Sequence, residues 1–351
     1  MKPFSHSEIN HAGRVLIADQ ATPRERDTAW QTLNDWRSLH LVPLNTFQAT
    51  LRHYVKEVAE RKGIVVQRLK RAPTILDKLK NRQQTMRLRQ MQDIGGLRAI
   101  VPDIKKAREL EKKFNAYSAR TKHHLTKQRD YIAAPKKSGY RGIHIIYQYH
   151  SPEKPEYDGL YVEIQLRTRL QHLWATAVET VGFFLQEALK SSQGNQDWLD
   201  FFKLVSALLA REENEQPHAD FGLCTKAELV AKINQLDRSR HVFKHLETIQ
   251  KTKFARENSK LNGAAYWVIE TLLNGNSTVK FYPFLESQKE AADLTYRQLE
   301  QTPEYLLGKK QVVLISSDSL SKIEQAYPNF LGDIDEFIKE LRRMVFSIKS
   351  Q

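Results

Sequence analysis

The spacing of apolar residues in the first 190 positions predicts an alternation of helices and strands. Apolar residues three and four apart between residues 24 and 62 indicate two helices, which Val42-Pro43 separates and Gly63 ends. Apolar runs predict strands at 64–69, 97–101, 142–149 and 160–166, and helical spacing predicts helices at 74–79, 105–117 and from Thr168 onward. Elements in this order predict one compact α/β or α+β unit up to about residue 190.

The pattern changes after the polar segment 191–195, which is typical of a linker. Helical spacing follows at 198–211, 226–251, 258–273 and 334–346, and strand-like runs follow at 278–284 and 311–316. Ser317-Asp318-Ser319 favours a helix cap. The apolar residues of 261–273, with Tyr266 and Trp267, fit the buried side of a helix better than a docking surface.

These patterns divide the chain into three expected parts. The first is a pair of N-terminal helices at 1–62, the second a mixed unit at 63–195, and the third a mainly helical region with short strands at 196–351. We expect the third part to be an accessory domain. It either regulates the chain, for example by binding a partner, or stabilises it, and the sequence leaves both interpretations open.

The composition indicates a soluble globular protein. Of 351 residues, 40% are hydrophobic and 27% charged, and the mean hydropathy is −0.57. No stretch approaches the roughly 20 apolar residues of a membrane span, and residues 1–10 lack the apolar core of a signal peptide. The single cysteine, Cys224, excludes an internal disulfide. We therefore expect a cytoplasmic protein without a membrane partner.

The charge narrows the range of partners. The formal net charge is +14, and basic residues are dense from 61 to 89, where aliphatic residues interleave with them. A folded basic face attracts polyanions such as nucleotides, RNA, DNA or acidic lipids. Solubility alone explains such a charge equally well outside an active site, so charge by itself assigns no partner.

A first candidate motif joins a strand end to a helix start. Arg68 and Lys70 stand at the end of the expected strand, and Thr74 and Lys78 are one turn apart on the next helix. A helix N-terminus beside several cations suits a triphosphate, because backbone amides and ammonium groups both favour the anion. Alone the motif is weak, since a basic run is usually a solvated face.

A second candidate motif lies at the start of the next strand. Asp93 precedes Gly95 and Gly96, and Arg98 follows inside the apolar run. An aspartate here can hold Mg²⁺ against nucleotide phosphates, and the glycines leave room for a ligand near the backbone. Asp93 could instead be a turn residue, but an unpaired guanidinium inside an apolar strand is costly.

A third candidate motif combines a loop with a strand. The segment Pro135-Lys136-Lys137-Ser138-Gly139-Tyr140 offers cations, a flexible glycine and an aromatic ring, which suit a phosphorylated nucleoside. Glu163, Gln165 and Arg167 alternate with apolar residues and share one strand face. For the alternation alone, a solvated face of an antiparallel sheet is normally the better explanation.

Together these segments resemble the RelA/SpoT alarmone synthetase domain. The resemblance rests on Arg68-x-Lys70-x₃-Thr74-x₃-Lys78, Gln92-Asp93-Ile-Gly-Gly-Leu-Arg98, Asp130-Tyr-Ile-Ala-Ala-Pro-Lys136-x-Ser-Gly-Tyr140-Arg-Gly-Ile-His144 and Glu163-Ile-Gln165-Leu-Arg167-Thr. Four motifs in the family's order, between about residues 63 and 190, are specific. The resemblance implies an α+β fold of the nucleotidyltransferase type, a mixed β-sheet flanked by helices.

The same resemblance implies the activity and the residue roles. A pyrophosphate would pass from ATP to the 3′-hydroxyl of GDP or GTP, with Mg²⁺ as cofactor, as in stringent-response signalling. Asp93 and Glu163 would be catalytic and hold the metal, and Glu163 would take the hydroxyl proton. ATP would be bound by Arg68, Lys70, Thr74, Lys78 and Arg98, with the two arginines enclosing adenine. The acceptor would be bound by Lys136, Tyr140, His144, Gln165, Arg167 and His172, with Tyr140 stacked on its base.

Some positions depart from the family pattern. Thr74 replaces a common serine, Asn81 stands where small synthetases are often basic, and His172 stands where they usually have asparagine. Residues 1–62 are shorter than the family's hydrolase domain and lack its histidine-aspartate metal signature, so we expect no alarmone hydrolysis.

Three functions therefore stay open from the sequence. The first is a small alarmone synthetase, and the second is a toxic relative that modifies the tRNA 3′ end or makes adenosine alarmones. The third is an inactive nucleotide- or RNA-binding module, which the presence of both Asp93 and Glu163 disfavours. The oligomeric state also stays open, a homo-oligomer included.

Overall fold

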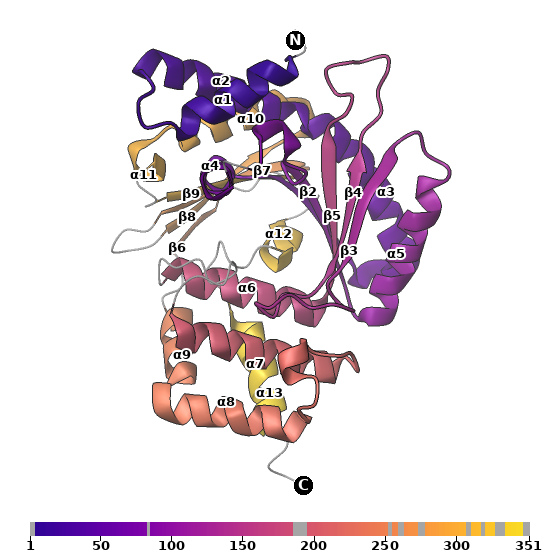
Figure 1. The fold of residues 1–351 in the computed structure, drawn as a ribbon, viewed down its shortest axis with the longest axis vertical. Helices are drawn as coiled ribbons and strands as arrows, with labels where there is room; N and C mark the ends of the chain where they lie inside the picture. Colours follow the sequence, from indigo (N-terminus) through magenta and orange to yellow (C-terminus); the bar gives the residue numbers. More distant parts are fainter. Residues whose placement is uncertain are drawn as a thin grey trace.

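One mixed β-sheet forms the centre of the molecule (Figure 1). The computed structural model describes residues 4–82, 85–184, 195–251, 255–258, 263–272, 278–306, 310–316, 320–326 and 334–346. The strands are β1 (Ile64–Leu69), β2 (Gly95–Val101), β3 (His124–Asp130), β4 (Ile143–Gln148), β5 (Tyr161–Thr168), β6 (Ala255–Asn258), β7 (Tyr266–Leu272), β8 (Thr278–Phe284) and β9 (Lys310–Ser316). Their order is β3-β4-β5-β2-β1-β9-β7-β8-β6. The pairs β2/β5 and β6/β8 are parallel and the others antiparallel, so the sheet is mixed as expected.

Helices flank this sheet and form a separate layer below it in Figure 1. They are α1 (His6–Ile17), α2 (Pro23–Leu39), α3 (Leu41–Ala59), α4 (Ala72–Asn81), α5 (Ile104–Ser118), α6 (Arg169–Phe184), α7 (Gln196–Glu212), α8 (Lys226–Arg240), α9 (Val242–Lys251), α10 (Lys289–Glu300), α11 (Pro303–Leu306), α12 (Leu320–Ala326) and α13 (Asp335–Phe346). Helices α6 to α9 and α13 share one apolar core, while α3 and α5 cover one face of the sheet. The expected α+β architecture with flanking helices is confirmed.

Local sequence explains where several helices begin. Ser5, Thr22 and Thr225 each accept a hydrogen bond from the backbone of a glutamate three residues later, whose side chain bonds back. Such capping boxes satisfy amides that a helix start leaves unpaired. The expected break at Val42-Pro43 is wrong: α2 ends at Leu39, and Pro43 lies in the first turn of α3. Proline is tolerated there because the first helical amides have no intrahelical acceptor.

The expectation of a helix at 258–273 is also wrong. Within the described part of this segment, residues 266–272 form strand β7, between β9 and β8. The side chains of Tyr266 and Trp267 are buried, so they are core residues, as the buried interpretation held. A continuous apolar run does not distinguish a central strand from a buried helix by periodicity. The expected cap at 317–319 lies outside the described residues, as does most of the expected linker.

The C-terminal part of the chain completes the sheet that the motif-bearing part begins. Strand β9 pairs with β1, and β7 pairs with β9. Helix α12 packs against β1, where Ile323 meets Val66 and Ile100 in one apolar cluster. The boundaries at 62 and 195 stay predictions, while the strands on both sides of the second boundary share one sheet. In the described part of the chain, no helix is long and apolar enough to span a membrane.

Candidate active site

The strand register brings the polar residues of the motifs onto one face of the sheet. The opposite face is apolar and is covered by α3 and α5. Because facing residues of neighbouring strands point to the same side, the paired positions define a polar row across five strands. This row consists of Lys127 and Arg129 on β3, His144 on β4, Glu163, Gln165 and Arg167 on β5, Gly96 and Arg98 on β2, and Arg68 on β1.

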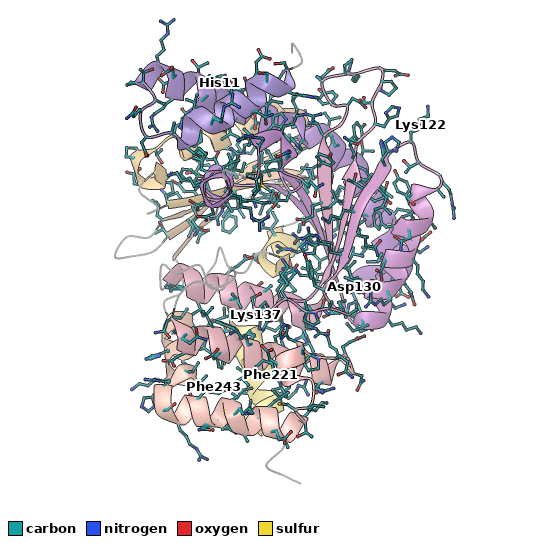
Figure 2. The ribbon with its side chains drawn as sticks, in the orientation of Figure 1. His11, Lys122, Asp130, Lys137, Phe221 and Phe243 are labelled. Atoms are coloured by element: carbon teal, nitrogen blue, oxygen red, sulfur yellow. The ribbon has the colours of Figure 1, made fainter. Side chains whose placement is uncertain are left out.

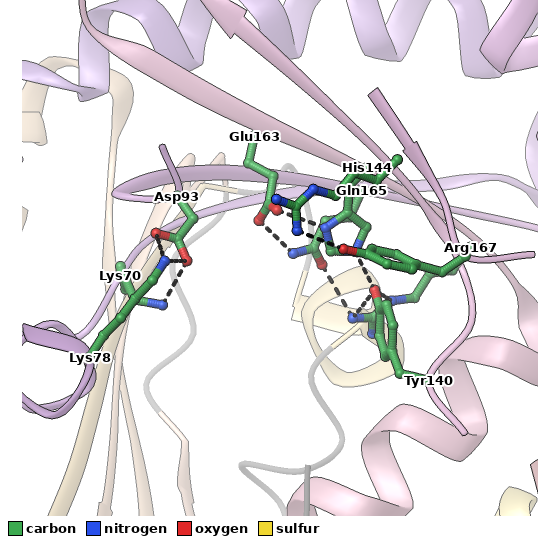
Figure 3. Close-up of polar contacts among 10 residues, drawn as sticks. Lys70, Lys78, Asp93, Tyr140, His144, Glu163, Gln165 and Arg167 are labelled. Atoms are coloured by element: carbon green, nitrogen blue, oxygen red, sulfur yellow. Dashed lines mark hydrogen bonds and ion pairs between the residues drawn. The ribbon is translucent and has the colours of Figure 1, made fainter. Parts of the chain in front are cut away.

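Five side chains of this region form a closed ring of hydrogen bonds (Figure 3). The Arg167 guanidinium donates to the Tyr140 hydroxyl at 3.1 Å and to Gln165 Oε1 at 3.2 Å. The Tyr140 hydroxyl lies 2.5 Å from His144 Nε2, and His144 Nδ1 lies 2.7 Å from Glu163 Oε1. Gln165 Nε2 closes the ring by donating to Glu163 Oε2 at 2.8 Å. Such linked bonds strengthen one another and fix the orientation of each member.

The chemistry of each group sets the direction of these bonds. Burial lowers the pKa of His144, and the cations Arg167 and Lys136 lower it further against the opposing pull of Glu163, so the imidazole is neutral at pH 7. A carboxylate only accepts, so Nδ1 carries the proton, and Nε2 accepts from Tyr140. Burial alone would raise the pKa of Glu163, but the positive charge that His144 carries when protonated, the hydrogen bonds from His144 and Gln165, and the charge of Lys70 together outweigh it and keep the pKa low. Glu163 is therefore an oriented, ionised carboxylate.

A second cluster gathers around Asp93, at the start of β2. Lys70 Nζ lies 3.0 Å from Asp93 Oδ2, and Lys78 Nζ lies 2.9 Å from Oδ1 (Figure 3). Burial would raise the pKa of Asp93, but both lysines outweigh it and lower the pKa. Glu163 faces Gly96 in the register of β5 and β2, three positions after Asp93, so both carboxylates belong to the same region of the sheet. The first and second motifs thus meet in space, beside the ring that the third motif forms.

Acid should weaken the Asp93 cluster. Because the pKa of Asp93 is lowered by folding, its ionised form contributes stability above the unfolded value of about 3.9, and this contribution is lost as the pH falls through the folded pKa. We expect the urea midpoint of the wild type to fall more steeply between about pH 5 and pH 3 than that of Asp93→Asn. Parallel curves for the two proteins would contradict the ion pairs with Lys70 and Lys78.

The remaining predicted residues lie around these clusters. Arg68 is half-buried diagonally beside buried Arg98, and Thr74 lies one turn before Lys78 on α4. His172 is buried on α6, and the Nζ of exposed Lys136 lies 4.9 Å from the Tyr140 ring centroid.

Tyr140 is only 3% exposed, and the Arg167 guanidinium lies 5.1 Å from its ring centroid, so stacking of the ring on a base requires Lys136 and Arg167 to move. A cavity of about 70 Å³ near α1 and α2 is lined by none of the predicted site residues.

Sequence reasoning missed two residues beside the site. Arg37 on α2 is buried and donates from Nε to the Lys70 carbonyl at 3.1 Å. Tyr131 is half-buried, and its ring centroid lies 4.4 Å from Lys136 Nζ and 5.2 Å from the His144 ring. Tyr131 stands in the quoted third motif, so its aromatic character was a usable signal. Arg37 gave none, because it belongs to an ordinary amphipathic helix.

Comparison with known proteins identifies the class of this region. Residues 67–181 match the family described as the region found in RelA / SpoT proteins. The resemblance of the four motifs is thereby confirmed for these residues. These residues include Asp93, its partners Lys70 and Lys78, and all five members of the hydrogen-bonded ring.

Particular relatives are similar over part of the chain. GTP pyrophosphokinase YjbM of Bacillus subtilis (strain 168) is 33% identical over 123 residues, which cover 34% of this chain and 56% of that protein. The chain therefore spans little more than half of that relative's length. A GTP pyrophosphokinase family protein from Streptococcus pneumoniae has a TM-score of 0.42 and 22% identity, covering 51% of this chain and 88% of that one. Small alarmone synthetase 1 of Bacillus subtilis bound to its product pppGpp has a TM-score of 0.40 and 25% identity, covering 50% of this chain and 91% of that one.

Proposed function

We propose that this protein is a nucleotide pyrophosphokinase that transfers the β,γ-pyrophosphate of ATP to the 3′-hydroxyl of GDP or GTP. One observation carries the proposal: an ionised, oriented Glu163 lies near an ionised Asp93 that two lysines flank. Carboxylates beside cations suit phosphoryl-type transfer, which depends on positioning and on charge stabilisation. The name of the similar Bacillus subtilis protein, GTP pyrophosphokinase YjbM, supports the same reaction class.

The reaction assigns a role to each cluster. The 3′-oxygen of the acceptor attacks the β-phosphorus of ATP, the bond from that phosphorus to the α,β-bridging oxygen breaks, and AMP leaves. Glu163 accepts the proton of the 3′-hydroxyl, since it is ionised and held in place by His144 and Gln165. When ATP binds, Lys70 and Lys78 release Asp93 and contact the phosphate oxygens of ATP instead. Arg68 and Arg98, diagonal neighbours on the polar row, enclose the adenine.

The residues fit a Mg²⁺ ion as cofactor. Among the described residues, no group of three or more His, Cys, Asp or Glu side chains could hold a metal by itself. Mg²⁺ does not need one, because it usually takes one or two carboxylates together with substrate phosphates. Asp93 and Glu163 are both ionised, and Glu163 faces Gly96, three positions after Asp93, so they are the proposed ligands. Bound there, Mg²⁺ would neutralise charge on the transferred phosphates.

A polynucleotide acceptor is the second candidate, and one observation favours it. Lys127 and Arg129 continue the polar row onto the edge strand β3, where both side chains are exposed. Exposed Lys136 and Lys137 lie on the loop that follows β3. These cations would suit further phosphates of an RNA such as tRNA, whose binding should then fall steeply with salt.

An acceptor panel tests the proposal. Purified protein with γ-³²P-ATP and Mg²⁺ is offered GDP, GTP, ADP, ATP or deacylated tRNA in separate reactions. We expect label on GDP or GTP, at rates that respond weakly to Lys127→Ala and Arg129→Ala. Label on tRNA, reduced in those two variants, would replace the proposal by the second candidate. Label on no acceptor would contradict both.

A further inference from the structure

Helix α7 contacts the loop between β3 and β4 at the position next to Tyr140. Ser206 Oγ donates to the Gly139 carbonyl at 2.5 Å, and both residues are buried. Gly139 has φ +89°, and a Cβ added to it would lie 2.9 Å from the Ser206 Cβ. Only glycine allows this close approach without strain. Figure 2 shows Lys137, on the same loop, where the sheet meets the helical layer that carries Phe221 and Phe243.

The C-terminal end of α7 adds a buried ionic contact on the other side of Tyr140. Glu213, which caps α7, lies 2.7 Å from the Arg141 guanidinium, and the two side chains are 6% and 3% exposed. Glu213 also accepts hydrogen bonds from the Thr168 hydroxyl and, at 3.2 Å, from Gln171. Losing the carboxylate charge would leave Arg141 buried without its counter-ion, which is strongly unfavourable.

These contacts flank two members of the hydrogen-bonded ring. Gly139 and Arg141 stand on either side of Tyr140, and Thr168 follows Arg167. Tyr140 and Arg167 in turn fix His144 and Gln165, the two donors to Glu163. We propose that Ser206 and Glu213 are positioning residues, through which α7 holds the ring that orients Glu163. Both lie outside residues 67–181, so the C-terminal region is part of the active site's support.

The inference rests on the proposed function and predicts a specific defect. Glu213→Gln keeps the shape of the side chain but removes the charge, and Ser206→Ala removes one hydrogen bond. We expect each to lower kcat by about 10- to 100-fold, because a small misplacement of a reacting group costs this much. The KM for ATP should change little, since the ATP-side lysines contact neither residue. A loosened ring no longer holds Glu163 in one orientation, so the defect should appear in the chemical step, which the single-turnover rate reports.

A neighbouring carboxylate provides the matched control. Glu212 lies at the end of the same helix but pairs with Lys226 at 3.1 Å and Arg343 at 2.8 Å, away from the ring. Glu212→Gln should therefore keep the wild-type kcat and single-turnover rate. The proposal is overturned if Glu213→Gln and Ser206→Ala both behave like Glu212→Gln. If Glu213→Gln does not fold, Ser206→Ala decides alone.

A measurement independent of transfer separates this inference from the proposed function. NMR of ¹⁵N-histidine protein, with the His144 signals assigned from His144→Gln, reports the tautomer and pKa of the imidazole. In the wild type we expect the Nδ1–H form and a pKa below the ordinary value of about 6.5. In Ser206→Ala and Glu213→Gln the Nδ1–H form should lose its dominance, because the hydrogen bonds with Tyr140 and Glu163 that select it loosen. Unchanged His144 signals in both variants overturn the positioning role, even if the wild type transfers no pyrophosphate.

Discussion

Replacement of Glu163 by glutamine should lower pyrophosphate transfer by about 10²- to 10⁴-fold, the range attributed to a general base. The amide is isosteric with the carboxylate but does not take the proton of the 3′-hydroxyl. Folding should survive, because the amide oxygen still accepts from His144 or Gln165. Initial rates of product formation from γ-³²P-ATP at saturating substrates measure the effect.

A neighbouring position controls for damage to the ring. Gln165→Glu places a carboxylate two residues away on the same strand face. The double variant Glu163→Gln with Gln165→Glu keeps the charge of the face and should stay as inactive as Glu163→Gln. Transfer by Glu163→Gln within about threefold of the wild type would exclude Glu163 as the base, since such a loss is far below the general-base range.

Removal of the Arg37 side chain should lower the free energy of unfolding by about 3–5 kcal/mol, as expected when a buried ion pair loses one partner. The Arg37 guanidinium lies 2.6 Å from Glu300 Oε2 and donates to Asn34, Tyr296 and the Lys70 carbonyl. Arg37→Ala would leave the buried carboxylate of Glu300 without its counter-ion. Urea unfolding followed by circular dichroism measures the loss.

An exposed ion pair is the control for this prediction. Arg343 pairs with Glu212 and Glu340, but its side chain is 54% exposed. Arg343→Ala should cost no more than about 1 kcal/mol, because solvent screens such pairs. Equal effects of Arg37→Ala and Arg343→Ala would contradict the view that α2 and α10 are joined by a buried ionic contact behind Lys70.

Local patterns predicted most strands and helices of the first half of the fold, but not α1 or β3, and missed part of the second half. Strand β1 and helices α5 and α7 lie close to where periodicity and flanking glycine or proline predict them. Strand β7 was predicted as part of a helix, because six of its seven residues are buried and the run therefore lacks the alternation that marks a half-buried strand. The pairing of β9 with β1 joins residues about 250 positions apart, which no local pattern contains.

The candidate site shows the same limit. The shared face of Glu163, Gln165 and Arg167 followed from alternation, and the four motifs indicated the other members of both clusters. The contacts between these side chains could not be predicted from the sequence, because they depend on the register of the strands. Ser206, Glu213 and Arg37 are single polar residues on amphipathic helices, and their roles come from contacts distant in sequence.

The fate of ATP in the presence of GTP tests the central claim most directly. Wild-type protein, Mg²⁺, γ-³²P-ATP and either GTP or 3′-deoxy-GTP are incubated, and the nucleotides are separated and quantified. We expect AMP and a labelled, pyrophosphorylated GTP to form in equal amounts, and 3′-deoxy-GTP to yield neither. Formation of ADP in place of AMP, or labelling of 3′-deoxy-GTP, would contradict pyrophosphate transfer to a 3′-hydroxyl.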